Sequence, residues 1–138
     1  MDKEIIREIV GDLDCGMKCF IHSETKEVKV IPDTDKYLDI DSDAWSATIE
    51  EIDNNIGDYI QIQGMDSRDS FKVMEAFVDT VDDERLREKL IDALSRRKPF
   101  QNFKFTIDNS GEYREKWFKF KDNALSEWVE SQLNERGL

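Results

Sequence analysis

The sequence predicts an α+β domain in which an N-terminal helix and a small three-stranded antiparallel sheet precede a mainly helical C-terminal half. Two observations carry this prediction. Three short segments before residue 63 alternate apolar and polar residues, as half-buried strands do, whereas the apolar residues after residue 67 recur at helical spacing. The 138 residues contain no linker rich in Pro, Gly and Ser, so we expect a single compact domain.

The N-terminal helix is predicted over residues 3–13 and ends near Gly16. Its apolar residues fall on one helical face: Ile5, Ile6, Ile9, Val10 and Leu13. A β-hairpin follows, with strands over residues 17–22 and 27–32 joined by a four-residue loop. Alternation in the first strand points Cys19 into the core, where a thiol behaves as a small apolar group. We expect Cys15 and Cys19 to remain thiols, because two cysteines are too few for a disulfide framework or a structural zinc site.

An acidic loop over residues 33–43 is predicted to lead into a helix capped by Ser42 or Asp43. Its apolar residues are Trp45, Ile49 and Ile52. The helix stops around residues 54–57, and residues 59–62 alternate as the third strand.

Helical spacing predicts four helices in the C-terminal half. The first is capped by Asp66 or Ser67, and the second opens at Asp82 or Asp83 and closes at Pro99; their stripes are Phe71, Met74, Phe77, Val78 and Val81, then Leu86, Leu90, Ile91 and Leu94. A short helix follows with Phe100, Phe103 and Ile107. After the Ser-Gly pair at residues 110–111, a long final helix runs to about Leu133.

The final helix carries two apolar seams about 100° apart, which predicts that it is covered on two sides. One seam contains Tyr113, Trp117, Phe120, Ala124 and Trp128, and the other contains Phe118, Leu125 and Val129. Arg114 and Lys121 lie angularly between the seams. Cations beside aromatic rings need a carboxylate, a π-face or a ligand, and these three alternatives stay open at the level of sequence.

Charge is distributed unevenly along the chain. The formal net charge is −12 and the pI about 4.5. Residues 96–121 reverse this sign with eight Lys and Arg against three Asp and Glu, a net of +5, so the rest of the chain carries −17. We call residues 96–121 the basic aromatic segment. Such asymmetry is typical of an anion-binding or self-docking surface.

The candidate binding residues all lie in this segment: Arg96, Arg97, Lys98, Lys104, Tyr113, Arg114, Trp117 and Lys121. A guanidinium group binds a carboxylate or phosphate through two parallel hydrogen bonds, which favours a pocket for an oxyanion or an acidic peptide. A structural interpretation stands beside this one. Cations at a helix C-terminus complement its dipole, and rings at helical spacing are typical of core packing.

The sequence gives little support to catalysis, and we expect no catalytic residue, metal or cofactor. His22 is the only histidine, and no glycine-rich phosphate loop or HExxH motif is present. Asp39, Asp41, Asp43 and Glu50 match oxygen positions of an EF-hand loop, but Ala44 stands where the sharp turn needs glycine. We therefore predict a solvated acidic loop rather than a calcium site.

Several stretches resemble the bacterial UPF0158 family of uncharacterised proteins, and the match spans nearly the whole chain. They are residues 74–77, 86–90, 98–100 and 103–104, then Arg114, Trp117, Phe120 and Trp128. The hairpin loop is similar as well, with Lys26 in place of that family's glycine. The resemblance implies a bacterial α+β domain and brings no activity with it.

These observations predict a protein-interaction or regulatory module that docks an acidic partner, or a second copy of itself, through the basic aromatic segment. A small-anion or single-stranded RNA binder using the same residues is the first alternative, and an enzyme of unknown class is the second. No run approaches the roughly 20 apolar residues of a membrane span, and the start lacks the apolar core of a signal peptide. We expect a cytoplasmic protein without a membrane partner.

Overall fold

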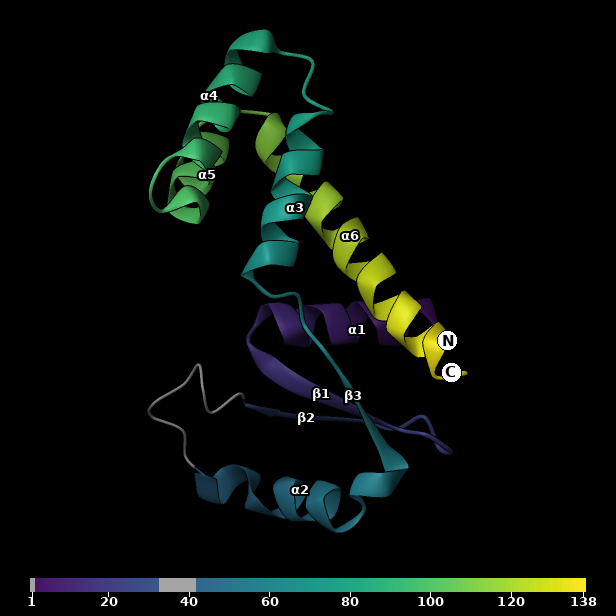
Figure 1. Ribbon diagram of the computed structural model, residues 1–138. Coiled ribbons are helices and arrows are strands. Elements are labelled where there is room, and N and C mark those ends of the chain that lie inside the picture. The colour runs from purple at the N-terminus through teal and green to yellow at the C-terminus, as the bar shows by residue number, and fades with distance from the viewer. Residues whose placement is uncertain (1, 33–41) are drawn as a thin grey trace. The chain divides into compact units, whose positions relative to one another are not determined.

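The computed structural model describes residues 2–32 and 42–138, with the side chains of residues 42–44 outside that description (Figure 1). The chain forms an α+β fold, as predicted. In chain order its elements are α1 (Lys3–Asp14), β1 (Met17–His22), β2 (Val28–Pro32), α2 (Ser42–Asn54), a 3₁₀ turn η1 (Ile56–Asp58), β3 (Tyr59–Ile62), α3 (Ser67–Val78), α4 (Glu84–Ser95), α5 (Pro99–Asp108) and α6 (Tyr113–Glu135).

Two compact units make up the chain. Unit 1 comprises Met1–Gly64 and Ser126–Leu138, and unit 2 comprises Met65–Leu125. The boundary between them falls inside α6, so the first half of that helix belongs to unit 2 and the second half to unit 1. The single domain expected from the sequence stays a prediction.

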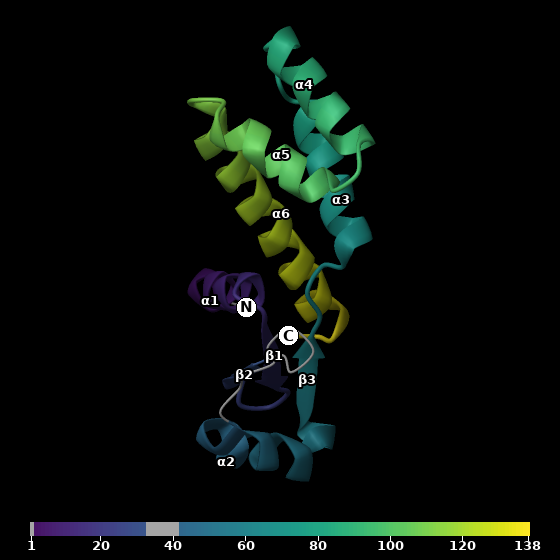
Figure 2. The same cartoon turned by 90° about the vertical axis from the view of Figure 1, so that its left-hand side faces the viewer.

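The sheet of unit 1 is antiparallel, with β1 between β2 and β3. Cys19 in the central strand lies opposite Val30 on one side and Ile62 on the other. Both faces of this sheet are covered, because α1 lies against one face and α2 against the other (Figures 1 and 2). Cys19 is buried, as predicted, with its Sγ 4.0 Å from the Ile9 carbonyl of α1, whereas the next residue, Phe20, packs with Ile52 of α2 on the opposite side.

The hairpin between β1 and β2 is closed by its own side chains. His22 Nδ1 accepts hydrogen bonds from the backbone N–H groups of Glu24 and Thr25, at 3.1 and 3.2 Å. Lys26 in this loop has φ 62°. That is the left-handed region that glycine enters most easily, so this turn keeps a glycine-like backbone without a glycine.

The second half of α6 is attached to β3 within unit 1 by an amide clamp. The side-chain amide of Gln132 accepts from the backbone N–H of Gln63 and donates to its carbonyl, both at 2.8 Å. The indole Nε1 of Trp128 donates to the same carbonyl at 2.8 Å. Val129 and Leu133 are fully buried beside these contacts.

Unit 2 is built around a cluster of aromatic rings contributed by α3, α5 and α6. The rings of Phe77, Phe103 and Trp117 meet edge to face with centroids 4.9 to 6.5 Å apart, a favoured geometry for aromatic pairs. Leu90 of α4 and Ile107 of α5 are buried in the same core. Asp66 and Asp83 cap α3 and α4, as the sequence predicts, because each accepts a backbone N–H of the following turn.

Two predicted core residues prove to be on the surface. Ile91 of α4 is exposed, although the helical stripe places it with Leu90. Phe118 of α6 is 40% exposed, so the second seam is not covered at this position. Helical spacing gives the angle of a residue around its own helix, but the width of the covered face depends on the neighbouring helices.

Candidate functional site

The turn between α4 and α5 holds three of the predicted binding residues. Arg96 ends α4, and its Nε lies 2.9 Å from Asp92 Oδ2, one helical turn earlier. The carbonyl of Arg97 accepts a hydrogen bond from the side-chain amide of Asn102 at 2.8 Å, which ties the turn to α5. Within the described part of the chain, the exposed side chains of Arg97 and Lys98 form no ion pair.

Lys98 occupies an unusual backbone position. It precedes Pro99 at the start of α5, and its φ and ψ are both 55°, in the left-handed region. A side chain at such a position costs about 1–2 kcal/mol relative to glycine. Glycine would therefore adopt this backbone conformation at a lower cost. What lysine provides at this position is its charged side chain.

One face of α5 is directed to solvent and continues from this turn. Gln101, Lys104, Phe105 and Asp108 are exposed, and their spacing of three and four residues places them on one stripe of the helix. Phe105 is 73% exposed, the most exposed large apolar residue among those described. Lys104, a predicted site residue, thus lies next to an aromatic ring that the sequence analysis did not single out.

Arg114 lies near the far end of that stripe. Its Nε is 3.2 Å from Asp108 Oδ1, and its guanidinium carbon is 4.7 Å from the centre of the Phe118 ring. The sequence left a carboxylate, a π-face and a ligand open as partners of this cation. The structure supplies the first two, and the Arg114 side chain is still 52% exposed.

The Tyr113 hydroxyl donates a hydrogen bond to Asp82, which precedes α4. This bond to a carboxylate raises the pKa of Tyr113 to about 12, and the same bond lowers the pKa of Asp82. The ammonium group of Lys116 lies 4.7 Å from the centre of the Tyr113 ring. Tyr113 is therefore engaged in holding α6 to the start of α4.

Trp117 and Lys121 stand apart from the exposed residues. Trp117 is only 7% exposed and is enclosed by the aromatic core of unit 2, so the structural interpretation holds for this ring. Lys121 is half-buried on α6.

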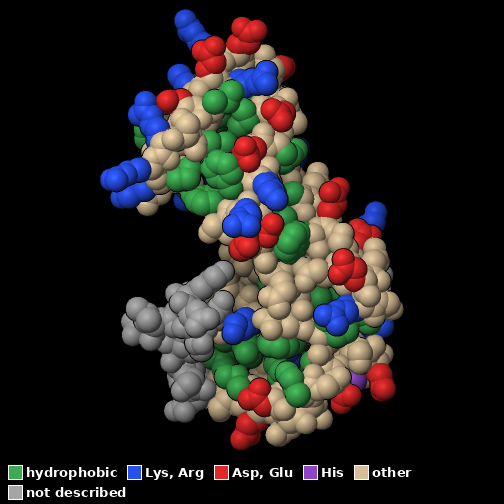
Figure 3. All heavy atoms as spheres, viewed as in Figure 1, with side chains coloured by type: hydrophobic (Ala, Val, Ile, Leu, Met, Phe, Trp, Pro, Cys, Tyr) green, Lys and Arg blue, Asp and Glu red, His purple; other side chains and the backbone are tan. Residues whose placement is uncertain are grey.

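Together these positions form one elongated surface, which we call the basic aromatic face: Arg97, Lys98, Lys104, Phe105, Arg114 and Phe118. Lys98 precedes α5 and Asp108 ends it, and this ten-residue helix is about 15 Å long at the helical rise of about 1.5 Å per residue. In Figure 3, Lys and Arg side chains lie over α4 and α5 beside exposed hydrophobic groups, with Asp and Glu side chains among them. Four of the predicted residues, Arg97, Lys98, Lys104 and Arg114, lie on this face, whereas Arg96, Tyr113, Trp117 and Lys121 do not.

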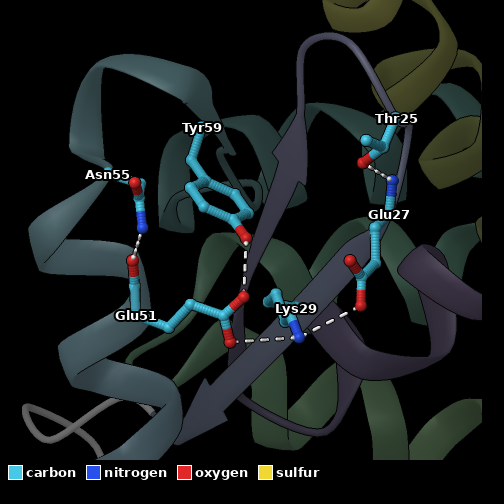
Figure 4. Close-up of polar contacts among 6 residues, drawn as sticks. All are labelled: Thr25, Glu27, Lys29, Glu51, Asn55 and Tyr59. Atoms are coloured by element: carbon cyan, nitrogen blue, oxygen red, sulfur yellow. Dashed lines mark hydrogen bonds and ion pairs between the residues drawn. The ribbon is translucent and has the colours of Figure 1, made fainter.

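A second polar cluster, in unit 1, was not found from the sequence. Lys29 of β2 forms ion pairs with Glu27 and Glu51 at 3.0 and 3.3 Å, and the Tyr59 hydroxyl donates to Glu51 at 3.5 Å (Figure 4). Hydrogen bonds to the two carboxylates raise the pKa of Lys29, and burial raises that of Tyr59. Because Glu51 lies on α2 and its partners Lys29 and Tyr59 lie on β2 and β3, the cluster attaches α2 to the sheet.

Asp39 and Asp41 of the EF-hand-like spacing lie outside the described residues, so the prediction of an acidic loop stays a prediction. His22, the only histidine, serves the hairpin turn through its Nδ1. None of the helices, over the residues searched, is both long and apolar enough to cross a membrane.

Comparison with known proteins identifies a family but assigns no function. The uncharacterised protein family UPF0158 matches residues 24–137. A UPF0158 protein of Pseudomonas aeruginosa is 26% identical over 116 residues, a match that covers 78% of this chain and 76% of the relative. No solved structure matches the chain. The chain belongs to the UPF0158 family, which confirms the resemblance seen in its sequence.

Proposed function

We propose that this protein is a cytoplasmic interaction module that docks an acidic segment of a partner protein on the basic aromatic face. The observation that carries the proposal is the exposure of cations and aromatic rings on one strip. Lys98 and Lys104 are exposed without an ion pair among the described residues, and Phe105 is 73% exposed beside them. A chain with a pI of about 4.5 places this strip against an acidic background, which favours a defined docking surface.

The two kinds of side chain have different roles in such docking. Exposed lysines raise the association rate of an acidic partner and make it sensitive to salt, but each contributes little to affinity. Desolvation of an aromatic ring contributes more, and aromatic and Arg residues are enriched at the energetic centres of interfaces. Phe105 and Phe118 are therefore expected to supply the apolar contact, and the cations to select an acidic partner.

The shape of the strip favours a peptide segment over a small anion. Arg97 and Arg114 lie beyond opposite ends of α5, a helix about 15 Å long by its rise per residue. A single carboxylate or phosphate group cannot touch both. An extended segment spans that distance with about five residues, so acidic residues alternating with apolar ones match the cations and rings of the face.

The test is a binding titration with a defined ligand. The acidic probe is a labelled synthetic peptide in which Glu alternates with Leu, and the neutral probe has Gln in place of Glu. At low salt we expect the wild type to bind the acidic probe and not the neutral one. The combined variant Arg97→Ala, Lys98→Ala and Lys104→Ala should lose this binding, whereas Arg7→Ala, an exposed arginine in unit 1, should retain it.

Other occupants are distinguished in the same assay. A peptide with the sequence of residues 33–43 tests docking of a second copy, and a single-stranded RNA oligonucleotide tests nucleic acid. Equal binding of the combined variant and the wild type, or tighter binding of RNA than of the acidic probe, would contradict the proposal. A nuclease-treated lysate pull-down then shows whether a natural partner has the acidic character of the probe.

A further inference from the structure

We infer that Arg114 is the anchor of the basic aromatic face and binds one carboxylate of the docked segment by donating hydrogen bonds from its two terminal amino groups. This inference rests on the proposed function and assigns its recognition chemistry. It predicts that the partner must present an Asp or Glu side chain, or a chain-terminal carboxylate, beside an apolar residue.

The guanidinium of Arg114 is oriented from two directions. Nε donates to Asp108 Oδ1 at 3.2 Å, and the guanidinium carbon lies over the Phe118 ring, 4.7 Å from its centre. Among the described residues no further partner of this guanidinium is found. Its Nη1 and Nη2 groups, at the end of the fork, can therefore donate two parallel hydrogen bonds to a carboxylate, the geometry that suits guanidinium.

This orientation reduces the cost of binding. A free arginine side chain loses rotamer freedom when it closes on a ligand, and that loss opposes association. Asp108 and Phe118 already restrict Arg114 in the unbound protein. The ring also offers an apolar surface next to the bound carboxylate, because 40% of Phe118 is exposed.

A purely structural role for Arg114 gives different expectations. An exposed ion pair contributes little to folding stability, and lysine can replace arginine in it as a point charge. Recognition of a carboxylate by two Nη groups requires the fork and does not survive that replacement. Arg114→Lys therefore separates the two roles while keeping the charge and allowing the contact with Asp108.

Affinity for the acidic probe is the quantity to measure. We expect Arg114→Lys and Arg114→Ala each to weaken it about tenfold, the size of a lost hydrogen bond to a charged group. Lys119→Ala is the matched control, because Lys119 is exposed on the same helix but about 140° around it from Arg114. It should change the affinity less than about twofold, in keeping with a surface charge. Thermal unfolding of each variant checks that the fold is intact.

The outcomes are distinct. A drop in affinity of about tenfold in both Arg114 variants but not in the control supports the anchor. If Arg114→Lys binds the acidic probe as the wild type does, while the combined Arg97, Lys98 and Lys104 variant does not, the inference is wrong and the proposed function stands. If the wild type does not bind the acidic probe at low salt, both are wrong.

Discussion

Single residues in unit 2 show how local geometry and charge are combined. Lys98 holds a left-handed backbone where glycine would be easier, and Arg114 holds a carboxylate and a ring at once. Trp117, which the sequence placed with the binding residues, belongs to the core. Residue type alone does not separate these cases, because exposure is decided by neighbours from other helices.

Lys98→Gly separates stability from binding at the α4–α5 turn. With φ 55°, the position favours glycine, so the variant should keep its folding stability or gain up to about 1 kcal/mol. Its affinity for the acidic probe should fall, because one cation is removed. Chemical denaturation and the binding titration measure the two effects. A variant that loses stability instead would show that the lysine side chain supports the turn.

The Tyr113–Asp82 contact predicts an ionisation at high pH. The folded pKa of Tyr113 is raised above the ordinary value of 10.0 to about 12, so its stabilising contribution is complete below about pH 10 and is lost as pH rises through about 12. The pKa of Asp82 is lowered from 3.8, so its contribution is complete above that value and is lost on acidification.

Ultraviolet absorbance of tyrosinate during an alkaline titration measures this ionisation. Asp82→Asn should shift the tyrosine transition near pH 12 toward the ordinary tyrosine pKa of 10.0. Tyr113→Phe should remove that transition. An identical titration curve for Asp82→Asn and the wild type would contradict the assignment.

At the scale of elements, the sequence predicts more than it does at the scale of side chains. The spacing of apolar residues is a local property, so the hairpin, β3 and the helices lie within a few residues of their predicted bounds. Contacts between distant segments leave no such signal. The clamp between Gln63 and Gln132 joins residues 69 positions apart. Likewise, the sequence does not say that α2 covers the second face of the sheet, where Phe20 packs.

Two phenylalanines of α5 test the direction in which this helix faces. Phe103 is buried among aromatic rings, so Phe103→Ala should lower the free energy of unfolding by about 3–5 kcal/mol. Phe105 lies two residues away and is exposed, so Phe105→Ala should change it by less than about 0.5 kcal/mol. Equal losses in chemical denaturation would mean that α5 packs on a different face.

Gln132 tests the attachment of α6 to β3 within unit 1. Gln132→Ala removes two hydrogen bonds to the backbone of Gln63 and should cost about 1–2 kcal/mol of stability. Hydrogen exchange at the Gln63 amide should become faster. Ser131→Ala, at the exposed neighbouring position, is the control and should leave that amide unchanged.

For the whole molecule, the informative property is the contrast between a net charge of −12 and a basic aromatic segment of +5. The sequence located this contrast and most of the cations, and it predicted docking of an acidic partner, with a small-anion site as an alternative. The length of α5 spreads them into a strip, and the rings on that strip are Phe105 and Phe118 rather than Trp117. That change favours an acidic protein segment as the ligand.

The most direct test of this account is amide chemical-shift mapping of the full chain during titration with the acidic probe at low salt. We predict shifts concentrated at Arg97, Lys98, Lys104, Phe105, Arg114 and Phe118 that disappear as salt is added. Shifts confined to residues of unit 1 would contradict the central claim that this face docks an acidic partner. So would an absence of shifts with the acidic probe and the neutral probe alike.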